Sequence, residues 1–168
     1  MLTFTTITHS AAETFQLGQH LGQIVQRGQV IALHGDLGAG KTVLTQGLAN
    51  GLGITARVTS PTFTLVSEYP RPSGGWLIHT DCYRLGSPTQ ADGVLEAAFF
   101  GMEEMLDRPD AIVVIEWAER IASLLPADHL QISLTYEPAT PEERQIVFTA
   151  HGPQSIQLLT QVQEKRQK

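Results

Sequence analysis

The first part of the chain alternates between patterns that are typical of strands and of helices. Residues 2–7 are rich in β-branched side chains and predict a short strand. Ser10 and Glu13 then have the spacing of a capping box, which indicates that a helix begins there. Apolar residues follow with a helical period, and we expect Gly28 to end this helix.

The next segment combines a strand pattern, a glycine-rich turn and a helix pattern. Residues 29–34 form a compact apolar run of strand length, and they lead directly into the turn at 35–40. We expect a helix over residues 41–50, which the glycines that follow terminate. Strand, glycine loop and helix in this order form the opening half of a βαβ unit, so the pattern predicts an α/β protein.

A hairpin is predicted in the middle of the chain. Residues 62–69 alternate between apolar and polar positions, as a half-buried strand does. A turn-rich break at 70–75 separates them from a second apolar stretch at 76–81. The two stretches are therefore expected to pair with each other.

A helical region and a buried strand follow the hairpin. Ser87, with proline at the next position, is expected to open the helical region, Gly101 to divide it, and Asp107 to end it. Residues 111–115 are a continuous apolar run, the pattern of a strand that is buried on both faces. A short helix is expected near residues 119–124.

The C-terminal part predicts two paired strands and a helix. Apolar side chains alternate from Leu130 to Tyr136, and residues 145–149 can pair back across a polar loop. Residues 154–168 have a helical pattern with a charged end, and we expect the tail from about residue 160 to fray.

Composition narrows the class of protein. The chain has 168 residues, 42% of them apolar, and is expected to form a single domain over 1–168. Its net charge of −6 disfavours a protein whose main task is to neutralise nucleic-acid phosphates. Cys82 is the only cysteine, which excludes an internal disulfide. No apolar run has the length of a membrane span, so we expect a cytoplasmic protein without membrane association.

The strongest chemical signal is the glycine-rich turn. Residues 35–42 read GDLGAGKT, which satisfies the pattern of a phosphate-binding loop. Its glycines allow backbone amides to surround phosphate oxygens, Lys41 adds a point charge, and Thr42 offers a hydroxyl to magnesium. Lys41 is also the only lysine before Lys165. The expected nucleotide-binding residues of the loop are Gly38, Ala39, Gly40, Lys41, Thr42 and Val43.

A nucleotide–magnesium site also needs a carboxylate at the end of a neighbouring strand. Glu116 follows the buried run at 112–115, and Asp81 follows the strand pattern at 76–80. We expect Glu116 to be the magnesium-side carboxylate and Asp81 to hold a metal-bound or attacking water. These two roles could be exchanged.

Several other residues allow two interpretations. Residues 60–63 are either a mobile segment whose hydroxyl senses the γ-phosphate or a plain turn that leads into a strand. Trp117 either stacks on a ligand or packs in the core. His34 and His79 lie in apolar strands, where core or rim positions are favoured over metal binding.

The chain resembles a known family through four blocks. They are GDLGAGKT at 35–42, SPTFTLV at 60–66, DCYRL at 81–85 and IEW at 115–117. Together, in this order and spacing, they resemble the TsaE (YjeE) family, bacterial ATPases needed for the threonylcarbamoyladenosine modification of tRNA. The agreement extends from about Ser10 to Tyr136.

The resemblance implies a P-loop NTPase-like α/β fold of three layers, with a mainly parallel sheet, antiparallel edge strands and flanking helices. It implies ATP and Mg²⁺ as cofactors, with Lys41, Asp81 and Glu116 as catalytic residues. It assigns nucleotide binding to the loop, to Thr62 in the switch-like segment and to Trp117. It further assigns magnesium binding to Thr42 and Glu116.

The resemblance also implies weak intrinsic ATP hydrolysis and association with the TsaB–TsaD assembly, through which tRNA is reached indirectly. No residue is placed as an arginine finger, which is worth about 10³–10⁵ in rate, although Arg84 is a candidate contributor. A small-molecule kinase with the same loop is the alternative function, but the arginines are scattered rather than clustered. A GTPase-type switch is disfavoured because a guanine-reading Asn-Lys-x-Asp block is absent.

Overall fold

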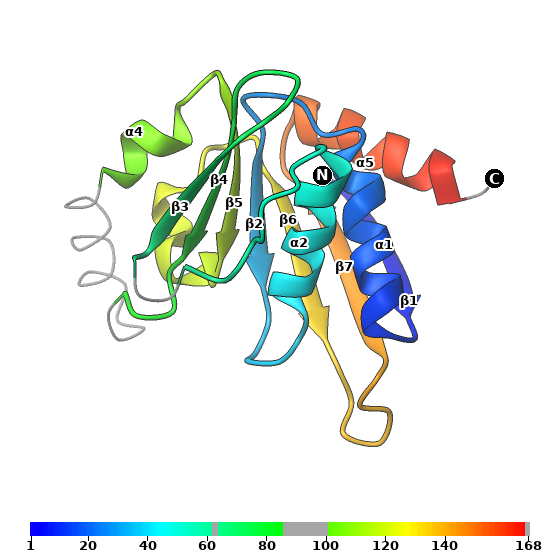
Figure 1. Ribbon diagram of the computed structural model, residues 1–168. Coiled ribbons are helices and arrows are strands. Elements are labelled where there is room, and N and C mark those ends of the chain that lie inside the picture. The colour runs from blue at the N-terminus through cyan, green and yellow to red at the C-terminus, as the bar shows by residue number, and fades with distance from the viewer. Residues whose placement is uncertain (62–63, 86–100, 167–168) are drawn as a thin grey trace.

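The computed structural model describes residues 1–61, 64–85 and 101–166. Strands and helices follow along the chain in an α/β order (Figure 1). They are β1 (Leu2–Thr8), α1 (Ala11–Gly22), β2 (Val30–His34), α2 (Lys41–Gly51), β3 (Val66–Pro70), β4 (Trp76–Asp81), α4 (Met102–Leu106), β5 (Ala111–Glu116), the 3₁₀ helix η1 (Ala118–Leu124), β6 (Leu130–Thr135), β7 (Arg144–Ala150) and α5 (Pro153–Arg166).

The seven strands found in the described part of the chain form one sheet in the order β1-β7-β6-β2-β5-β4-β3. The four central strands, β6, β2, β5 and β4, are parallel to their neighbours. The edges are antiparallel, with β1 and β7 on one side and β3 on the other. Every residue of β5 is buried, which explains why this strand reads as an unbroken apolar run. The predicted sheet is therefore confirmed.

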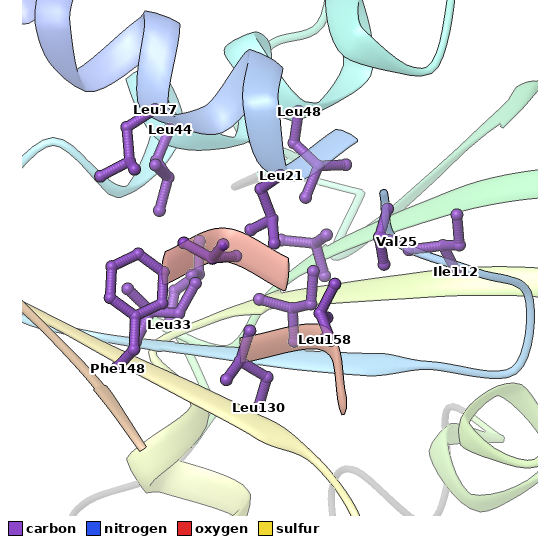
Figure 2. Packing of buried hydrophobic residues seen from close by; sticks show 14 of the residues in the cluster. Leu17, Leu21, Val25, Leu33, Leu44, Leu48, Ile112, Leu130, Phe148 and Leu158 are labelled. Carbon is purple, nitrogen blue, oxygen red and sulfur yellow. The ribbon is translucent and has the colours of Figure 1, made fainter. Parts of the chain in front are cut away.

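Helices cover both faces of the sheet and complete three layers. One core cluster joins α1, α2 and α5 to the sheet, and Figure 2 shows Leu17 and Leu21 of α1 with Leu44 and Leu48 of α2 above it. A second cluster lies on the opposite face and includes Met102 of α4 and residues of η1. In Figure 1, α1 and α2 lie side by side in front of the sheet.

Helices α1 and α2 approach each other through glycine. A Cβ atom on Gly18 would lie 2.2 Å from the carbonyl oxygen of Leu44, and one on Gly47 would lie 2.0 Å from that of Phe15. Gly22 and Gly51 are equally close to the facing backbone. These distances leave no room for any other residue, so the glycines set the spacing of the two helices.

Helix α1 is shorter than its apolar pattern predicts. It ends at Gly22, not at Gly28, because the amides of Ile24 and Val25 both donate to the carbonyl of Leu21 and close a tight last turn. Gly28 lies in the following turn with φ of +81°, where its amide donates to the carbonyl of Ala111 at the start of β5. The chain thus leaves the helix early in order to enter the sheet.

The N-terminus of α1 is close to the prediction. The Ser10 side chain accepts a hydrogen bond from the Glu13 amide at 3.2 Å. The Glu13 carboxylate accepts from the amide of His9, at 2.8 Å, instead of from that of Ser10. The second bond of the capping box, from the Glu13 side chain, therefore reaches the residue before the N-cap.

Strand β3 begins later than predicted, at Val66 and not at residue 62. Leu65 has φ of +63°, which turns the backbone, and its amide donates to the carbonyl of Pro61 at 2.7 Å. A strand cannot pass through such a turn. The predicted β3–β4 hairpin is confirmed, with Val66 opposite Thr80.

The end of α4 agrees with the pattern, whereas α5 extends further than predicted. Helix α4 is capped at Asp107, and Gly101 precedes it with φ of +68°. The predicted opening at Ser87 lies outside the described residues. Helix α5 continues through the segment that was expected to fray, and Val162 is buried within it. Among the described residues, no helix is long and apolar enough to cross a membrane.

Candidate nucleotide-binding site

An open cleft of about 390 Å³ lies at the carboxyl ends of the parallel strands. Parallel strands bring their carboxyl ends to one edge of a sheet, where ligands of open α/β folds bind. The cleft is formed by the loop after β2, the first turn of α2, and the ends of β4 and β5. Its lining residues are Leu37, Gly38, Ala39, Gly40, Lys41, Thr42, Val43, Ser60, Asp81, Tyr83, Glu116 and Trp117.

Two glycines shape the loop between β2 and α2. Gly35 has φ of +140°, and a Cβ atom there would lie 2.4 Å from the carbonyl oxygen of Leu134. Gly40 caps α2 with φ of +102°. The first amides of α2 therefore face the cleft without a side-chain cap, and a helix N-terminus with free amides favours anions.

Lys41 is buried at the floor of this loop. Its ammonium donates to the carbonyls of Gly35 and Asp36, the latter at 3.0 Å. It also lies 4.1 Å from the centroid of the Trp117 ring. Burial lowers the pKa of Lys41, and the nearby carboxylate of Glu116 partly opposes this shift. The cleft thus contains a cation that an anionic ligand would stabilise.

Thr42 and Glu116 meet across the cleft. The Thr42 hydroxyl donates to both carboxylate oxygens of Glu116, at 2.9 and 3.0 Å. Thr42 belongs to the first turn of α2, and Glu116 is the last residue of β5. A hydroxyl and a carboxylate at this distance are hard oxygen ligands that suit Mg²⁺.

Asp81 ends β4 directly beside Glu116, its partner in the β4–β5 register. One carboxylate oxygen accepts from the Ser60 hydroxyl at 2.6 Å, and the other accepts from the Tyr83 amide at 2.8 Å. These bonds hold the carboxylate at the edge of the cleft. Asp81 therefore connects the segment around Ser60 to the end of the sheet.

Trp117 lies at the boundary between the cleft and the core. Its ring lines the cleft and packs against Tyr83, with ring centroids 4.9 Å apart. It also packs against the core cluster beneath α4 and η1. Its φ of +58° is unusual for a residue with a side chain. The backbone therefore turns sharply directly after Glu116.

The structure brings together nearly all of the predicted site residues. Gly38 through Val43, Asp81, Glu116 and Trp117 all line the same cleft. Thr62 lies outside the described residues, whereas its neighbour Ser60 lines the cleft. Arg84 is exposed and is not among the side chains that line it.

Two residues next to the site were not assigned a role by the sequence. His79 is buried as expected, but its Nε2 lies 2.8 Å from the Glu116 carboxylate. The alternation of β4 places His79 on the same face as Asp81, a signal that was available in the pattern. Arg144 of β7 donates to the carbonyls of Ala39 and Gly38 at 3.0 and 3.1 Å, and no local pattern indicates this contact.

The oxygen ligands of the cleft suit a cation that shares its shell with a bound phosphate. Within the described ranges, no group of three or more His, Cys, Asp or Glu side chains could hold a metal ion by itself. Mg²⁺ in phosphate-transfer sites is commonly held by one or two protein oxygens, with substrate phosphates and waters completing its shell. Thr42 and Glu116 match that requirement.

Comparisons with known proteins identify the family of this chain. A family model described as "Threonylcarbamoyl adenosine biosynthesis protein TsaE" matches residues 8–146. The tRNA threonylcarbamoyladenosine biosynthesis protein TsaE of Bacillus subtilis is 39% identical over 147 residues, which cover 86% of this chain and 84% of that protein. The TsaE protein of Nostoc sp. is 44% identical over 123 residues, covering 73% and 72%.

A solved structure extends the similarity to the whole fold. The crystal structure of Bacillus subtilis YdiB superposes with a TM-score of 0.77 at 30% sequence identity, covering 98% of this chain and 97% of that one. The family model spans the phosphate-binding loop, both strand-end carboxylates and Trp117. The chain therefore belongs to the TsaE family and to the biosynthesis of threonylcarbamoyladenosine in tRNA.

Proposed function

We propose that this protein is a cytoplasmic ATPase that binds ATP with Mg²⁺, hydrolyses it slowly alone, and acts on the TsaB–TsaD assembly during threonylcarbamoyladenosine synthesis. One observation carries the proposal. Lys41 and Thr42 of the loop share a cleft with the carboxylates of Asp81 and Glu116 from two adjacent parallel strands. This is the set of groups that phosphoryl transfer to water requires.

Each side chain has a distinct task in this proposal. The amides at the start of α2 and the Lys41 ammonium bind phosphate oxygens. Thr42 and Glu116 provide oxygen ligands for Mg²⁺, which neutralises phosphate charge when it is bound. Asp81 is within the cleft and accepts hydrogen bonds readily, so it can orient a water and accept its proton.

The composition of the cleft favours slow hydrolysis over a kinase activity. Among the described side chains that line it, none is an arginine. A kinase of this loop class needs cations that clamp the transferred phosphoryl group, and fast hydrolysis needs an arginine finger worth about 10³–10⁵ in rate. We therefore expect a partner to supply the missing charge.

The mouth of the cleft supports a protein partner. Leu37 of the glycine-rich loop is 75% exposed, and Tyr83, which also lines the cleft, is 44% exposed. Large apolar side chains in such positions are favourable contacts for another protein. A partner that covers the mouth would also exclude water from the phosphates. Binding of tRNA is assigned to the partners, in agreement with the net charge of −6.

An ATPase assay tests the proposal directly. Phosphate release is measured for the purified protein with and without the homologous TsaB and TsaD proteins, and Lys41→Ala serves as the inactive control. We expect slow turnover alone, stimulation by the pair, and loss of both in the variant. Fast turnover without partners, or phosphate transfer to a small-molecule acceptor in a parallel screen, would contradict the proposal.

A further inference from the structure

His79 has no contact with the cleft itself, but it bonds to a residue that lines it. Its side chain is 0% exposed, and Nε2 lies 2.8 Å from Oε1 of Glu116, whose side chain is 4% exposed. In the β4–β5 pairing, His79 lies opposite Val114 and Asp81 lies opposite Glu116. His79 therefore lies two residues before Asp81 in β4, on the same face of the sheet as the two carboxylates.

The burial of this imidazole is unfavourable by itself. An ionised carboxylate has no proton to donate, so His79 Nε2 must carry the proton of this hydrogen bond. Nδ1 is also buried, and it has no hydrogen-bond partner among the described residues. An apolar side chain would suit the strand better, because a buried polar atom without a partner destabilises the fold. Among the described residues, the contact with Glu116 is the interaction that accounts for a histidine here.

Glu116 is held from two sides. Oε1 accepts from His79 on the sheet side and from the Thr42 hydroxyl on the loop side, and Thr42 also donates to Oε2. If Thr42 exchanged this contact for a metal ion, the hydrogen bond from His79 would be retained. That bond would then restrict how the carboxylate rotates about its last torsion angle.

We infer that His79 is a positioning residue that orients the Glu116 carboxylate for the divalent cation. This inference rests on the proposed binding of nucleotide with Mg²⁺. A hydrogen-bond partner behind a ligating carboxylate typically changes metal affinity or activity by about 10–100-fold. His79 is not among the described residues that line the cleft, so we expect nucleotide binding without the cation to be independent of it.

The test compares two polar replacements. In His79→Gln the amide nitrogen lies at about the reach of Nε2, whereas in His79→Asn it stops short. A non-hydrolysable ATP analogue is titrated calorimetrically into each full-length variant, with Mg²⁺ and with EDTA. We expect the gain in affinity from Mg²⁺ to fall about tenfold in His79→Asn and to be largely kept in His79→Gln. Affinity in EDTA should be unchanged in both.

The Ile78→Ala variant and the wild-type protein serve as controls. Ile78→Ala removes a fully buried side chain from the same strand but on the opposite face, so it reports a loss that is merely structural. If the wild-type protein does not bind the analogue, the proposed function fails. If it binds with a gain from Mg²⁺ that all three variants keep or lose equally, the inference about His79 is wrong and the proposed function stands.

A measurement on the wild-type protein needs no variant. Nitrogen-15 spectra of the imidazole groups identify which ring nitrogen of His79 carries a proton. We expect the Nε2–H form, with a resonance that shifts when Mg²⁺ and the analogue are added. A neutral ring protonated at Nδ1 could not donate to Glu116 and would overturn the inference.

Discussion

The guanidinium of Arg144 donates to the carbonyl oxygen of Ala39 at 3.0 Å, although 105 positions of the chain separate the two residues. A second donor of Arg144 reaches the carbonyl of Gly38 at 3.1 Å, and the guanidinium lies 4.9 Å from the centroid of the Tyr136 ring. The antiparallel edge of the sheet thus holds the phosphate-binding loop from behind. The two bonds restrict the peptide groups that follow Gly38 and Ala39, directly before α2 begins.

Loss of this contact should weaken nucleotide binding. We expect Arg144→Ala to raise the Kd for an ATP analogue roughly 5–30-fold, because hydrogen bonds that involve a charged group contribute about 1–2 kcal/mol or more. Calorimetry measures the change. Arg144→Lys keeps the charge without the fork, so it should recover only part of the affinity. Arg27→Ala, in the turn before β2 begins, removes the same charge and should have no effect on the Kd; an equal loss there would contradict this prediction.

Variants of the two carboxylates should lose different properties. We expect Asp81→Asn to lower hydrolysis by about 10²–10⁴-fold while analogue binding persists, because proton acceptance is lost while the shape of the side chain is kept. Glu116→Gln should lower both hydrolysis and the Mg²⁺-dependent part of binding. Phosphate release and calorimetry provide the two measurements.

The control for this pair is Glu119→Gln. Glu119 follows Glu116 closely in the chain but does not line the cleft, so hydrolysis should be retained. Wild-type turnover in Asp81→Asn or in Glu116→Gln would remove that residue from the site.

Because of the close contact between α1 and α2, replacing glycine by alanine should destabilise the protein, the opposite of its usual effect in a helix. In an exposed helix, alanine is more favourable than glycine by about 1 kcal/mol. At Gly18, however, the added methyl would meet the Leu44 carbonyl at 2.2 Å, so we expect Gly18→Ala to reduce the free energy of unfolding by about 1–3 kcal/mol. Urea denaturation measures it. Gln16→Ala, at an exposed position of the same helix, should be neutral or stabilising.

Cys82 should be chemically inert in the folded protein. Burial, followed by the nearby charge of Asp81, raises the pKa of its thiol to about 12. Only about one thiol in 10⁴ is then ionised at pH 8, and the thiolate is the reactive form. We expect no reaction with a thiol reagent in native buffer and complete reaction in urea. Rapid native labelling would indicate that the strand end opens readily.

Histidine burial should make the fold sensitive to mild acid. Burial lowers the pKa of His34 below 6.5, and Glu119 at 4.0 Å only partly opposes the shift. The unfolded chain therefore binds a proton more readily than the folded protein does. This contribution to stability is complete above about pH 6.5 and is lost as the pH falls below that value.

Melting temperatures at pH 7.5 and pH 5.5 test the sign. The difference between the two should be smaller in His34→Asn than in the wild-type protein. His20→Asn, which changes an exposed histidine of α1, should leave the difference as it is. A larger difference in His34→Asn would show that protonation of His34 stabilises the fold.

The sequence by itself determined those features that depend on neighbouring residues. The loop at 35–42 follows from glycine spacing, β5 from its unbroken apolar run, and the β3–β4 hairpin from alternation around a turn. Because a strand-end carboxylate follows its strand directly, Asp81 and Glu116 could be assigned to one edge of the sheet. The pattern predicts too long a helix α1, because the apolar period continues beyond Gly22, where a tight turn ends the helix.

Only the tertiary structure decided which distant residues support the site. His79 reaches Glu116 because β4 and β5 pair in one particular register, and Arg144 reaches the loop because β7 lies two strands from β2. The contact of Gly18 with Leu44 likewise depends on how two helices pack. Such contacts join residues that are far apart in the chain, and their distances follow from strand order, register and helix packing, which local periodicity does not encode.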